Sequence, residues 1–386
     1  MNKKFLAVLT ACTLGLSMTA CGSAPTGSGS GSNSNAFQLG TIGPLTGSNA
    51  IYGQAVANGA KIAVDEINAM GGIQFDLRSV DDVADTETSV NAYHDLLDKG
   101  MQVLVSPTTT NSSIEVSSHT CTDRVFMLTP SSSSPDVTAG KDNVFQVCFT
   151  DPALGTLSAE FMAENMPDAN IGVLYRSDDP YSQGVRDAFA LKAKEKNLNI
   201  VYEGSFTDDT SSNFEVQLTA ANAAGVDLMF IPIYFQPASI ILNQAKALGF
   251  APTFFGVDGL DGLLEMDNFD ASLADGVVLM TPFSADSTDE ATSKFVKTYK
   301  EKCGTAPNQF AADAYDAVYI VKAALEMAGC TTDDTPQEIC EALIPVMTQL
   351  KHDGLTGKNM TWSANGAVSK EPLVMVIQDG TYVPYQ

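Results

Sequence analysis

The sequence predicts an α/β protein of two Rossmann-like lobes, each a parallel sheet covered by helices, joined by a three-stranded hinge. From residue 37 onwards, short β-type runs alternate with amphipathic helical patterns, which favours parallel sheets with helices on both faces. The alternation restarts after residue 149, so two similar lobes are expected. A chain of 386 residues, of which 44% are hydrophobic, is long enough for two domains with sizeable cores.

The first run of alternating elements begins with an apolar strand and an amphipathic helix. Apolar residues from Val56 to Ile67 recur at 4-3-4 spacing, and Gly71-Gly72 ends the helical pattern. The strands expected in this run are 37–42, 75–80, 102–106 and 125–129. The helices expected between them are 53–69, 86–98 and 112–121.

The second run has the same rhythm and is followed by three more helices. Its expected strands are 171–175, 199–203, 228–233 and 253–255, and its expected helices are 153–165, 182–196, 213–224 and 238–248. The later helices, about 290–303, 309–328 and 336–350, are expected to return to the first lobe. The segments expected to cross between lobes are 144–149, 276–281 and 372–378. The expected boundaries are 37–149 plus 282–367 for lobe 1, and 150–281 plus 368–386 for lobe 2.

The N-terminal part has the pattern of a bacterial lipoprotein. Lys3 and Lys4 precede a short apolar run, and small residues lead up to Cys21. The apolar run is far shorter than the ~20 residues that a membrane-spanning helix needs. Cys12 follows a similar cleavage motif, Leu9-Thr10-Ala11, but cleavage before Cys12 would leave a signal peptide whose apolar segment has only a few residues. We therefore expect a signal peptide over 1–20, acylation of Cys21 and a flexible Gly/Ser tether over 21–36.

The chain is strongly acidic. Its formal net charge is −25, and loss of the two signal-peptide lysines would make it −27. Such a protein is repelled by nucleic acid and by anionic lipid headgroups. We therefore expect no nucleic-acid partner, membrane contact only through the lipid anchor, and a monomer on the cell surface or periplasmic side of the cytoplasmic membrane.

Cysteine and histidine are sparse. Five cysteines follow Cys21, which is an odd number, and none has metal-ligand spacing. Cys330 and Cys340 are close enough for a local disulfide, and free thiols fit the sequence equally well. The histidines fall in predicted helices or exposed turns, away from strand ends: His94, His119 and His352. Since no catalytic motif is present either, we expect neither an enzyme nor a metal or cofactor site.

Polar and aromatic residues follow the predicted strands at their carboxyl ends, where doubly wound sheets bind ligands. Two hydroxyl-rich turns, 107–113 and 130–135, follow consecutive strands, and their N–H and O–H groups can donate to a carboxylate. In the second run, Asp151 and Asp258 are acceptors suited to an ammonium group. Aromatic residues suited to enclosing an apolar side chain are Tyr52, Tyr181, Tyr234 and Phe310.

Several motifs together resemble one family. Gly43-Pro44-Leu45-Thr46-Gly47, Asp65-Glu66-Ile67-Asn68-Ala69 and Ala314-Tyr315-Asp316-Ala317 are similar to segments of the leucine/isoleucine/valine-type binding proteins of ABC importers. The similarity covers nearly the whole mature chain. It implies the type I periplasmic-binding-protein fold, with permease transmembrane subunits as partners.

The resemblance also implies roles for single residues. The ligand carboxylate would meet Thr109 or Thr110 and Ser132 or Ser133, and the ammonium would meet Asp151 and Asp258. The aromatic wall would consist of Tyr52, Tyr181, Tyr234 and Phe310. Two positions depart from the family pattern, because Asp258 stands where a longer Glu is usual and Phe310 lacks a frequent hydroxyl. These departures leave the side chain of the ligand open.

The sequence thus predicts a clamshell that closes on an α-amino acid with a branched-chain, other apolar or aromatic side chain. The closed form would be recognised by the importer. Two alternatives stay open: the same fold could bind another small solute such as an amide, urea, a sugar or an aromatic acid, or it could serve as a ligand sensor without import.

Overall fold

The computed structural model describes residues 35–385. The predicted signal peptide, the acylated Cys21 and all but the end of the tether lie outside the described residues. Within the described part of the chain, no helix combines the length and the apolar character that crossing a membrane requires.

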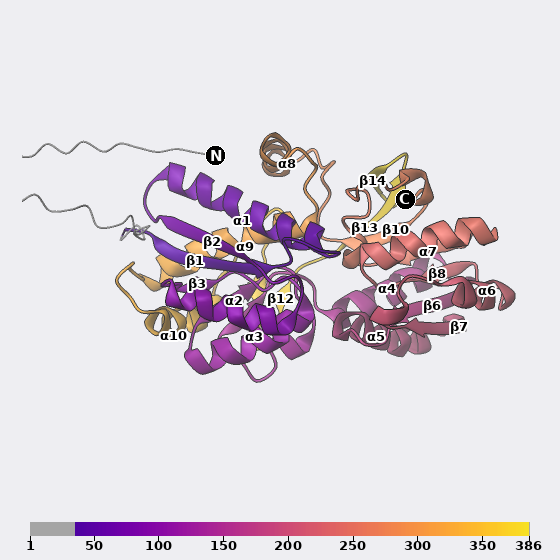
Figure 1. Ribbon diagram of the computed structural model, residues 1–386, viewed down its shortest axis with the longest axis horizontal. Helices are drawn as coiled ribbons and strands as arrows, with labels where there is room; N and C mark the ends of the chain where they lie inside the picture. The colour runs from indigo at the N-terminus through magenta and orange to yellow at the C-terminus, as the bar shows by residue number, and fades with distance from the viewer. Residues whose placement is uncertain (1–34, 386) are drawn as a thin grey trace, which may run out of the picture. The chain divides into compact units, whose positions relative to one another are not determined.

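The first sheet contains five parallel strands in the order β2-β1-β3-β4-β5 (Figure 1). The strands are β1 (Phe37–Gly43), β2 (Phe75–Asp81), β3 (Val103–Leu104), β4 (Phe126–Thr129) and β5 (Val144–Gln146). All seven residues of β1 are buried, because strands flank it on both edges and helices pack against it. The connecting helices are α1 (Ala50–Met70), α2 (Thr86–Asp98) and α3 (Thr110–Asp123). Since the strands are parallel, their carboxyl ends share one edge of the sheet.

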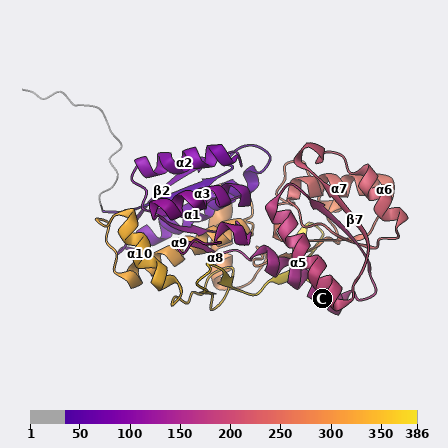
Figure 2. The same cartoon turned by 90° about the horizontal axis from the view of Figure 1, so that it is seen from below.

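The second sheet contains seven strands in the order β14-β13-β10-β9-β8-β6-β7. Its parallel strands are β6 (Asn170–Arg176), β7 (Asn199–Phe206), β8 (Leu228–Phe230), β9 (Thr253–Gly256) and β10 (Val278–Thr281). The antiparallel strands β13 (Leu373–Gln378) and β14 (Thr381–Pro384) extend it. The helices of this part are α4 (Asp151–Asn165), α5 (Pro180–Lys196), α6 (Glu215–Ala223) and α7 (Phe235–Leu248), several of which Figure 2 shows from below.

The three later helices pack on elements of the first sheet and its helices. They are α8 (Glu290–Cys303), α9 (Gln309–Ala328) and α10 (Pro336–Met347). α8 and α9 pack against α1, and α10 packs against β4 and α9. Gly59 lets α1 and α9 approach closely, because a Cβ atom at this position would lie 2.0 Å from the carbonyl oxygen of Ala311. We call the five-stranded sheet with α1–α3 and α8–α10 lobe 1, and the seven-stranded sheet with α4–α7 lobe 2.

The chain passes between the lobes three times: after β5, after β10 and before β13. β5 belongs to the sheet of lobe 1, whereas β10 and β13 are paired neighbours in the sheet of lobe 2. Lys370, in the third crossing, is fully buried and forms an ion pair of 2.8 Å with Asp313 of α9. Its ammonium also donates to the carbonyl of Val147 in the first crossing at 3.0 Å. This one side chain therefore ties two of the crossings to a helix of lobe 1.

Three short strands were not predicted. β14 follows β13 through a two-residue hairpin in which Asp379 and Gly380 have φ values of 50° and 73°, as a type I′ turn requires. The other two, β11 (Thr361–Trp362) and β12 (Val368–Ser369), form a separate antiparallel pair. The indole N–H of Trp362 donates to the carbonyl of Gln146 at 2.8 Å, which fastens this pair to β5.

All five cysteines of the described residues are free thiols: Cys121, Cys148, Cys303, Cys330 and Cys340. Of the two options left open by the sequence, free thiols are therefore the one found in this structure.

Candidate ligand-binding site

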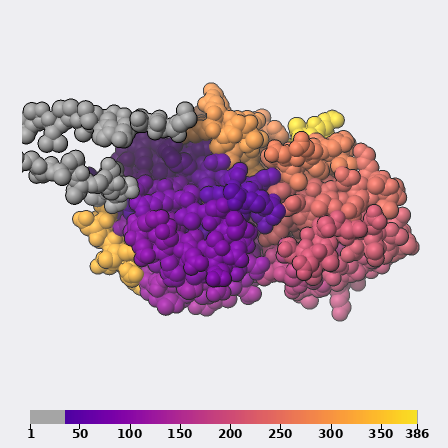
Figure 3. All heavy atoms as spheres, in the orientation of Figure 1, coloured from indigo at the N-terminus to yellow at the C-terminus, as the bar shows by residue number. Residues whose placement is uncertain are grey.

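A small cavity of about 20 Å³, which is room for about one water molecule, lies where strand ends of the two lobes face each other. Figure 3 shows the atoms of the two lobes meeting along one face of the protein. The lining residues come from both lobes: Tyr52, Thr108, Thr109, Thr110, Ser131, Ser133, Tyr181, Tyr234, Asp258, Gly259 and Phe310.

Hydroxyl groups of lobe 1 form one wall of the cavity. Thr109 is the N-cap of α3 and Thr110 is its first residue, so the unpaired N–H groups of the first helical turn lie beside the cavity. Ser131 and Ser133 line it from the turn after β4. This wall therefore consists of hydrogen-bond donors at the positive end of a helix dipole, which suits an anionic group.

The expected pair Ser132 and Ser133 divides between two environments. Ser133 lines the cavity, whereas the hydroxyl of Ser132 donates to the carbonyls of Pro107 and Thr108 at 3.2 and 3.1 Å. Ser132 thus holds the two hydroxyl-rich turns together. The sequence did not single out Thr108 or Ser131, although both lie in turns that it had marked.

Asp258 is the carboxylate that lines the cavity. It is 2% exposed, and its Oδ1 accepts a hydrogen bond of 2.7 Å from the hydroxyl of Tyr181. The same hydroxyl accepts the N–H of Gly259 at 3.0 Å, so the carboxylate and the ring hold each other in place. Burial raises the pKa of Asp258 to about 6, against the opposing effect of the Tyr181 hydrogen bond. Since this pKa lies below neutral pH, Asp258 presents a negative charge to the cavity at pH 7.

Asp151 lies behind the cavity wall and does not line it. It begins α4 and is fully buried, and neither carboxylate oxygen has a hydrogen bond of normal geometry. Gly184 of α5 makes room for it, because a Cβ atom there would lie 2.8 Å from Oδ2 of Asp151. Burial raises the pKa of Asp151 well above its usual value, and the side chain of Ser133 opposes this rise in part. Of the two expected acids, only Asp258 is therefore in direct reach of the cavity.

The four expected aromatic residues come together at the cavity. Tyr52 of α1 lies 5.4 Å from Tyr234 and 4.8 Å from Phe310, measured between ring centroids. Tyr181 and Tyr234 are stacked at 5.1 Å. Phe235, which the sequence did not mark, lies 4.8 Å from Tyr52. These rings give the cavity an apolar portion between the hydroxyl wall and Asp258.

The hydroxyl of Tyr52 joins the two lobes. It donates to the carbonyl of Gly259 at 2.6 Å and accepts the N–H of Phe235 at 3.0 Å, and both partners belong to lobe 2. Burial raises the pKa of Tyr52 well above its usual value, so the hydroxyl keeps its proton at all ordinary pH values.

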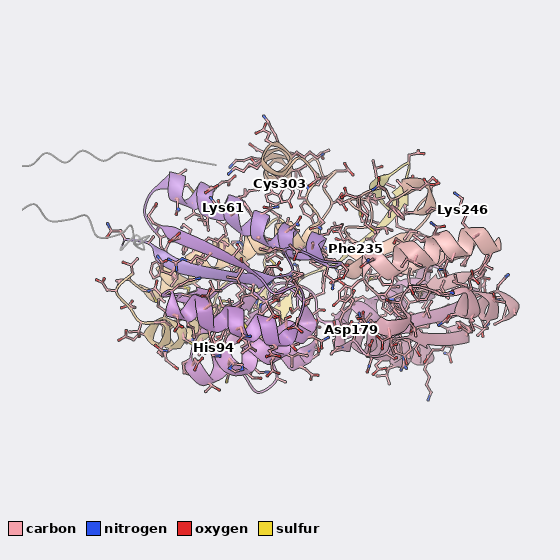
Figure 4. The ribbon with its side chains drawn as sticks, viewed as in Figure 1. Lys61, His94, Asp179, Phe235, Lys246 and Cys303 are labelled. Carbon is pink, nitrogen blue, oxygen red and sulfur yellow. The ribbon has the colours of Figure 1, made fainter. Side chains whose placement is uncertain are left out.

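The histidines lie elsewhere. The rings of His94 on α2 and His119 on α3 are 5.2 Å apart, and neither residue lines the cavity. In Figure 4, His94 lies far from Asp179 and Phe235, which lie where the lobes face each other. His352 pairs with Met360 in an isolated bridge. Among residues 35–385, no group of three or more His, Cys, Asp or Glu residues is arranged to hold a metal ion.

This geometry defines a class of protein that holds a small solute between two α/β lobes. The sequence profile of the periplasmic binding protein family matches residues 36–381, and the chain belongs to this family. It is a family of solute-binding proteins of ABC transporters and not a family of enzymes.

Individual relatives are similar over most of the chain. The Leu/Ile/Val-binding protein homolog 3 of Brucella melitensis is 28% identical over 299 residues, which cover 76% of this chain and 80% of that protein. The crystal structure of a leucine binding protein from Thermotoga maritima has a TM-score of 0.81 and 25% identity, with 91% of this chain and 98% of that one covered.

A branched-chain amino acid transporter substrate binding protein from Streptococcus pneumoniae, solved in complex with isoleucine, has a TM-score of 0.80 and 25% identity, with coverage of 90% and 97%. These matches confirm the predicted fold class and the family resemblance.

Proposed function

We propose that this protein is the extracellular substrate-binding lipoprotein of an ABC importer and that it binds an α-amino acid between its lobes. The observation that carries the proposal is the opposite character of the two cavity walls. Lobe 1 offers hydroxyl and N–H donors, whereas lobe 2 offers the buried carboxylate of Asp258, with aromatic rings between them. An amino acid has an anionic end, a cationic end and a side chain that match these three parts.

Each part of the ligand would then have its own partners. The carboxylate would accept from Thr110, Ser133 and the first turn of α3, and the ammonium would donate to Asp258. An apolar or aromatic side chain would pack against Tyr52, Tyr234 and Phe310. Thr109 and Ser132 would hold the donors in place, and Asp151 would support Ser133 from behind.

Closure of the lobes would follow from these contacts. Shifting a two-state equilibrium from 1:99 to 99:1 takes roughly 5.5 kcal/mol of preference for the closed state. A hydrogen bond to a charged group contributes about 1.5–3 kcal/mol. Three such bonds to the carboxylate and one from the ammonium to Asp258 would therefore suffice, provided that they form only when both lobes are in contact with the ligand.

We further propose that the protein is anchored by a lipid outside the cytoplasmic membrane. The N-terminal sequence supports acylation of Cys21 after removal of residues 1–20, with the body held at the outer face of the cytoplasmic membrane by the tether. The partners would be the transmembrane subunits of a permease, and the protein would act as a monomer. A role as a ligand sensor would use the same cavity without the permease.

A thermal-shift screen of the twenty amino acids tests the proposed ligand class. A ligand at about 100 times its dissociation constant stabilises a protein by ~2.7 kcal/mol, which gives an easily measured rise in melting temperature. We expect at least one branched-chain, apolar or aromatic amino acid to stabilise the wild type and not Asp258→Asn. Urea, a simple amide, a sugar and benzoate belong in the same screen. A shift with one of these and with no amino acid would refute the proposal.

A further inference from the structure

The loop that contains Asp258 connects β9 to β10 in lobe 2 and holds two further acidic residues, Asp261 and Glu265. It also contains Gly259 and Gly262. Oδ2 of Asp261 accepts the N–H of Gln309 at 2.7 Å. Gln309 is the first residue of α9, so this bond joins lobe 2 to a helix of lobe 1.

The same loop meets α1 of lobe 1 closely. Gly262 has a φ of 122°, and a Cβ atom added to it would lie 3.0 Å from Cγ2 of Ile51. Asp261 is 4% exposed, and Oε2 of Glu265 is buried without a hydrogen-bond partner. Two acidic residues, four positions apart, therefore lie at the seam between the lobes: Asp261 is buried, and Glu265 is partly exposed with one buried carboxylate oxygen.

Among residues 35–385, the titratable groups around this pair are acids, phenols and one thiol. They are Asp258 and Asp267 of the same loop, Tyr52 of α1, Tyr299 and Cys303 of α8, Asp313 of α9 and Tyr382 of β14. Burial and the charge of Glu265 raise the pKa of Asp261 well above its usual value, and burial raises the pKa of Glu265 to about 7.

We propose that Asp261 is a positioning residue that fastens the Asp258 loop to α9, and that closure of the lobes takes up a proton at the Asp261–Glu265 pair. The inference rests on the proposed closure around a ligand, and the ligand itself does not touch the pair. When the lobes separate, water reaches both carboxyl groups and both ionise at neutral pH. The closed form holds one proton more, because two neighbouring buried negative charges are unfavourable. The contribution of Glu265 to closure, and with it to ligand affinity, then weakens as the pH rises from about 4.3, the ordinary pKa of an exposed glutamate, to about 7, and changes little above that.

The first test holds the lobes closed with the solute of the screen, amino acid or other, that gives the largest shift. Thermal unfolding of the full chain at a saturating concentration of this solute is followed from pH 5 to pH 8.5 for the wild type, Glu265→Gln and the control Glu164→Gln, which removes an exposed glutamate on α4. Between pH 5 and pH 7 the wild type and the control should lose up to roughly tenfold in folding equilibrium per pH unit more than Glu265→Gln does, and above pH 7 this difference should level off. Equal pH dependence in all three proteins would overturn the proposal.

The second test counts protons with the amino acid that gives the largest shift in the screen. Calorimetric titration at pH 6 in phosphate and in Bis-Tris, two buffers with different ionisation enthalpies, gives the number of protons taken up per ligand bound. This pH lies between the ordinary pKa of an exposed glutamate and the pKa of about 7 of Glu265 in the closed form, and any contribution of Asp258 is shared by all three proteins. We expect the wild type and Glu164→Gln to take up nearly one proton more than Glu265→Gln. The same count in all three would contradict the proposal. If no amino acid binds, the proposed function fails, while the unfolding test with another solute still decides on the pair.

The positioning role of Asp261 is tested separately. Asn at this position keeps an oxygen that can accept from Gln309, whereas Ala does not. We therefore expect Asp261→Ala to weaken ligand binding about tenfold, which corresponds to one lost hydrogen bond, and Asp261→Asn to retain most of the affinity. Equal effects of the two substitutions, or no effect of either, would refute the positioning role.

Discussion

Replacing Tyr52 by phenylalanine removes the oxygen atom through which α1 holds lobe 2. The ring, and its contacts with Tyr234 and Phe310, would stay in place. The carbonyl of Gly259 and the N–H of Phe235 would lose partners at 2.6 and 3.0 Å. A buried polar group left unpaired costs about 1–3 kcal/mol, so two of them disfavour the closed arrangement by at least ~2 kcal/mol.

Since every 1.4 kcal/mol is a factor of ten, Tyr52→Phe should raise the dissociation constant of the amino-acid ligand about 30-fold. Titration calorimetry measures this directly. The matched control is Tyr93→Phe, because the hydroxyl of Tyr93 donates to Asp123 at 3.0 Å entirely within lobe 1. The control should lower the melting temperature but leave the affinity unchanged. Wild-type affinity in Tyr52→Phe, or an equal loss in both variants, would show that the inter-lobe bonds do not support binding.

Three further predictions concern single positions. Gly59→Ala should destabilise the protein by about 1–3 kcal/mol in urea unfolding, because the added methyl group collides with the carbonyl of Ala311. Lys370→Met should cost about 3–5 kcal/mol, since it leaves Asp313 charged and buried, and replacing Asp313 by leucine as well should recover part of this loss. In the Glu265→Gln background, which removes the opposing titration of the Asp261–Glu265 pair, ligand affinity should fall about tenfold between pH 7 and pH 5, because the pKa of Asp258 is about 6 and only its ionised form binds an ammonium, whereas adding Asp258→Asn should give weak binding at both pH values in calorimetry.

Much of the architecture was readable from the sequence because its elements are long and strongly periodic. The predicted bounds of α2, α8 and α9 agree with the structure. The short strands β11, β12 and β14 were not predicted, because two to four residues are too few to show the alternation of apolar and polar residues that marks a strand. Their positions depend on tertiary contacts, such as the bond from Trp362 to β5.

Some features of the candidate site could also be predicted from the sequence, and others could not. The rule that ligands bind beyond strand ends found both hydroxyl-rich turns and all four aromatic residues. It could not decide which serine of the second turn faces the cavity, because the direction of Ser132 is set by the carbonyls of Pro107 and Thr108. Asp261 and Glu265 were missed because acidic residues in a loop are usually solvated. Only the close approach of α1 and α9 encloses them.

The C-terminal hairpin of β13 and β14 has a consequence for biosynthesis. Lobe 2 is built from a middle stretch of chain and from residues 373–384, because β13 pairs with β10 almost a hundred positions earlier. Until residues 373–378 have left the ribosome or the export channel, β10 is an open sheet edge with unpaired N–H and C=O groups. A truncated product without β13 would therefore expose this edge to pairing with other chains.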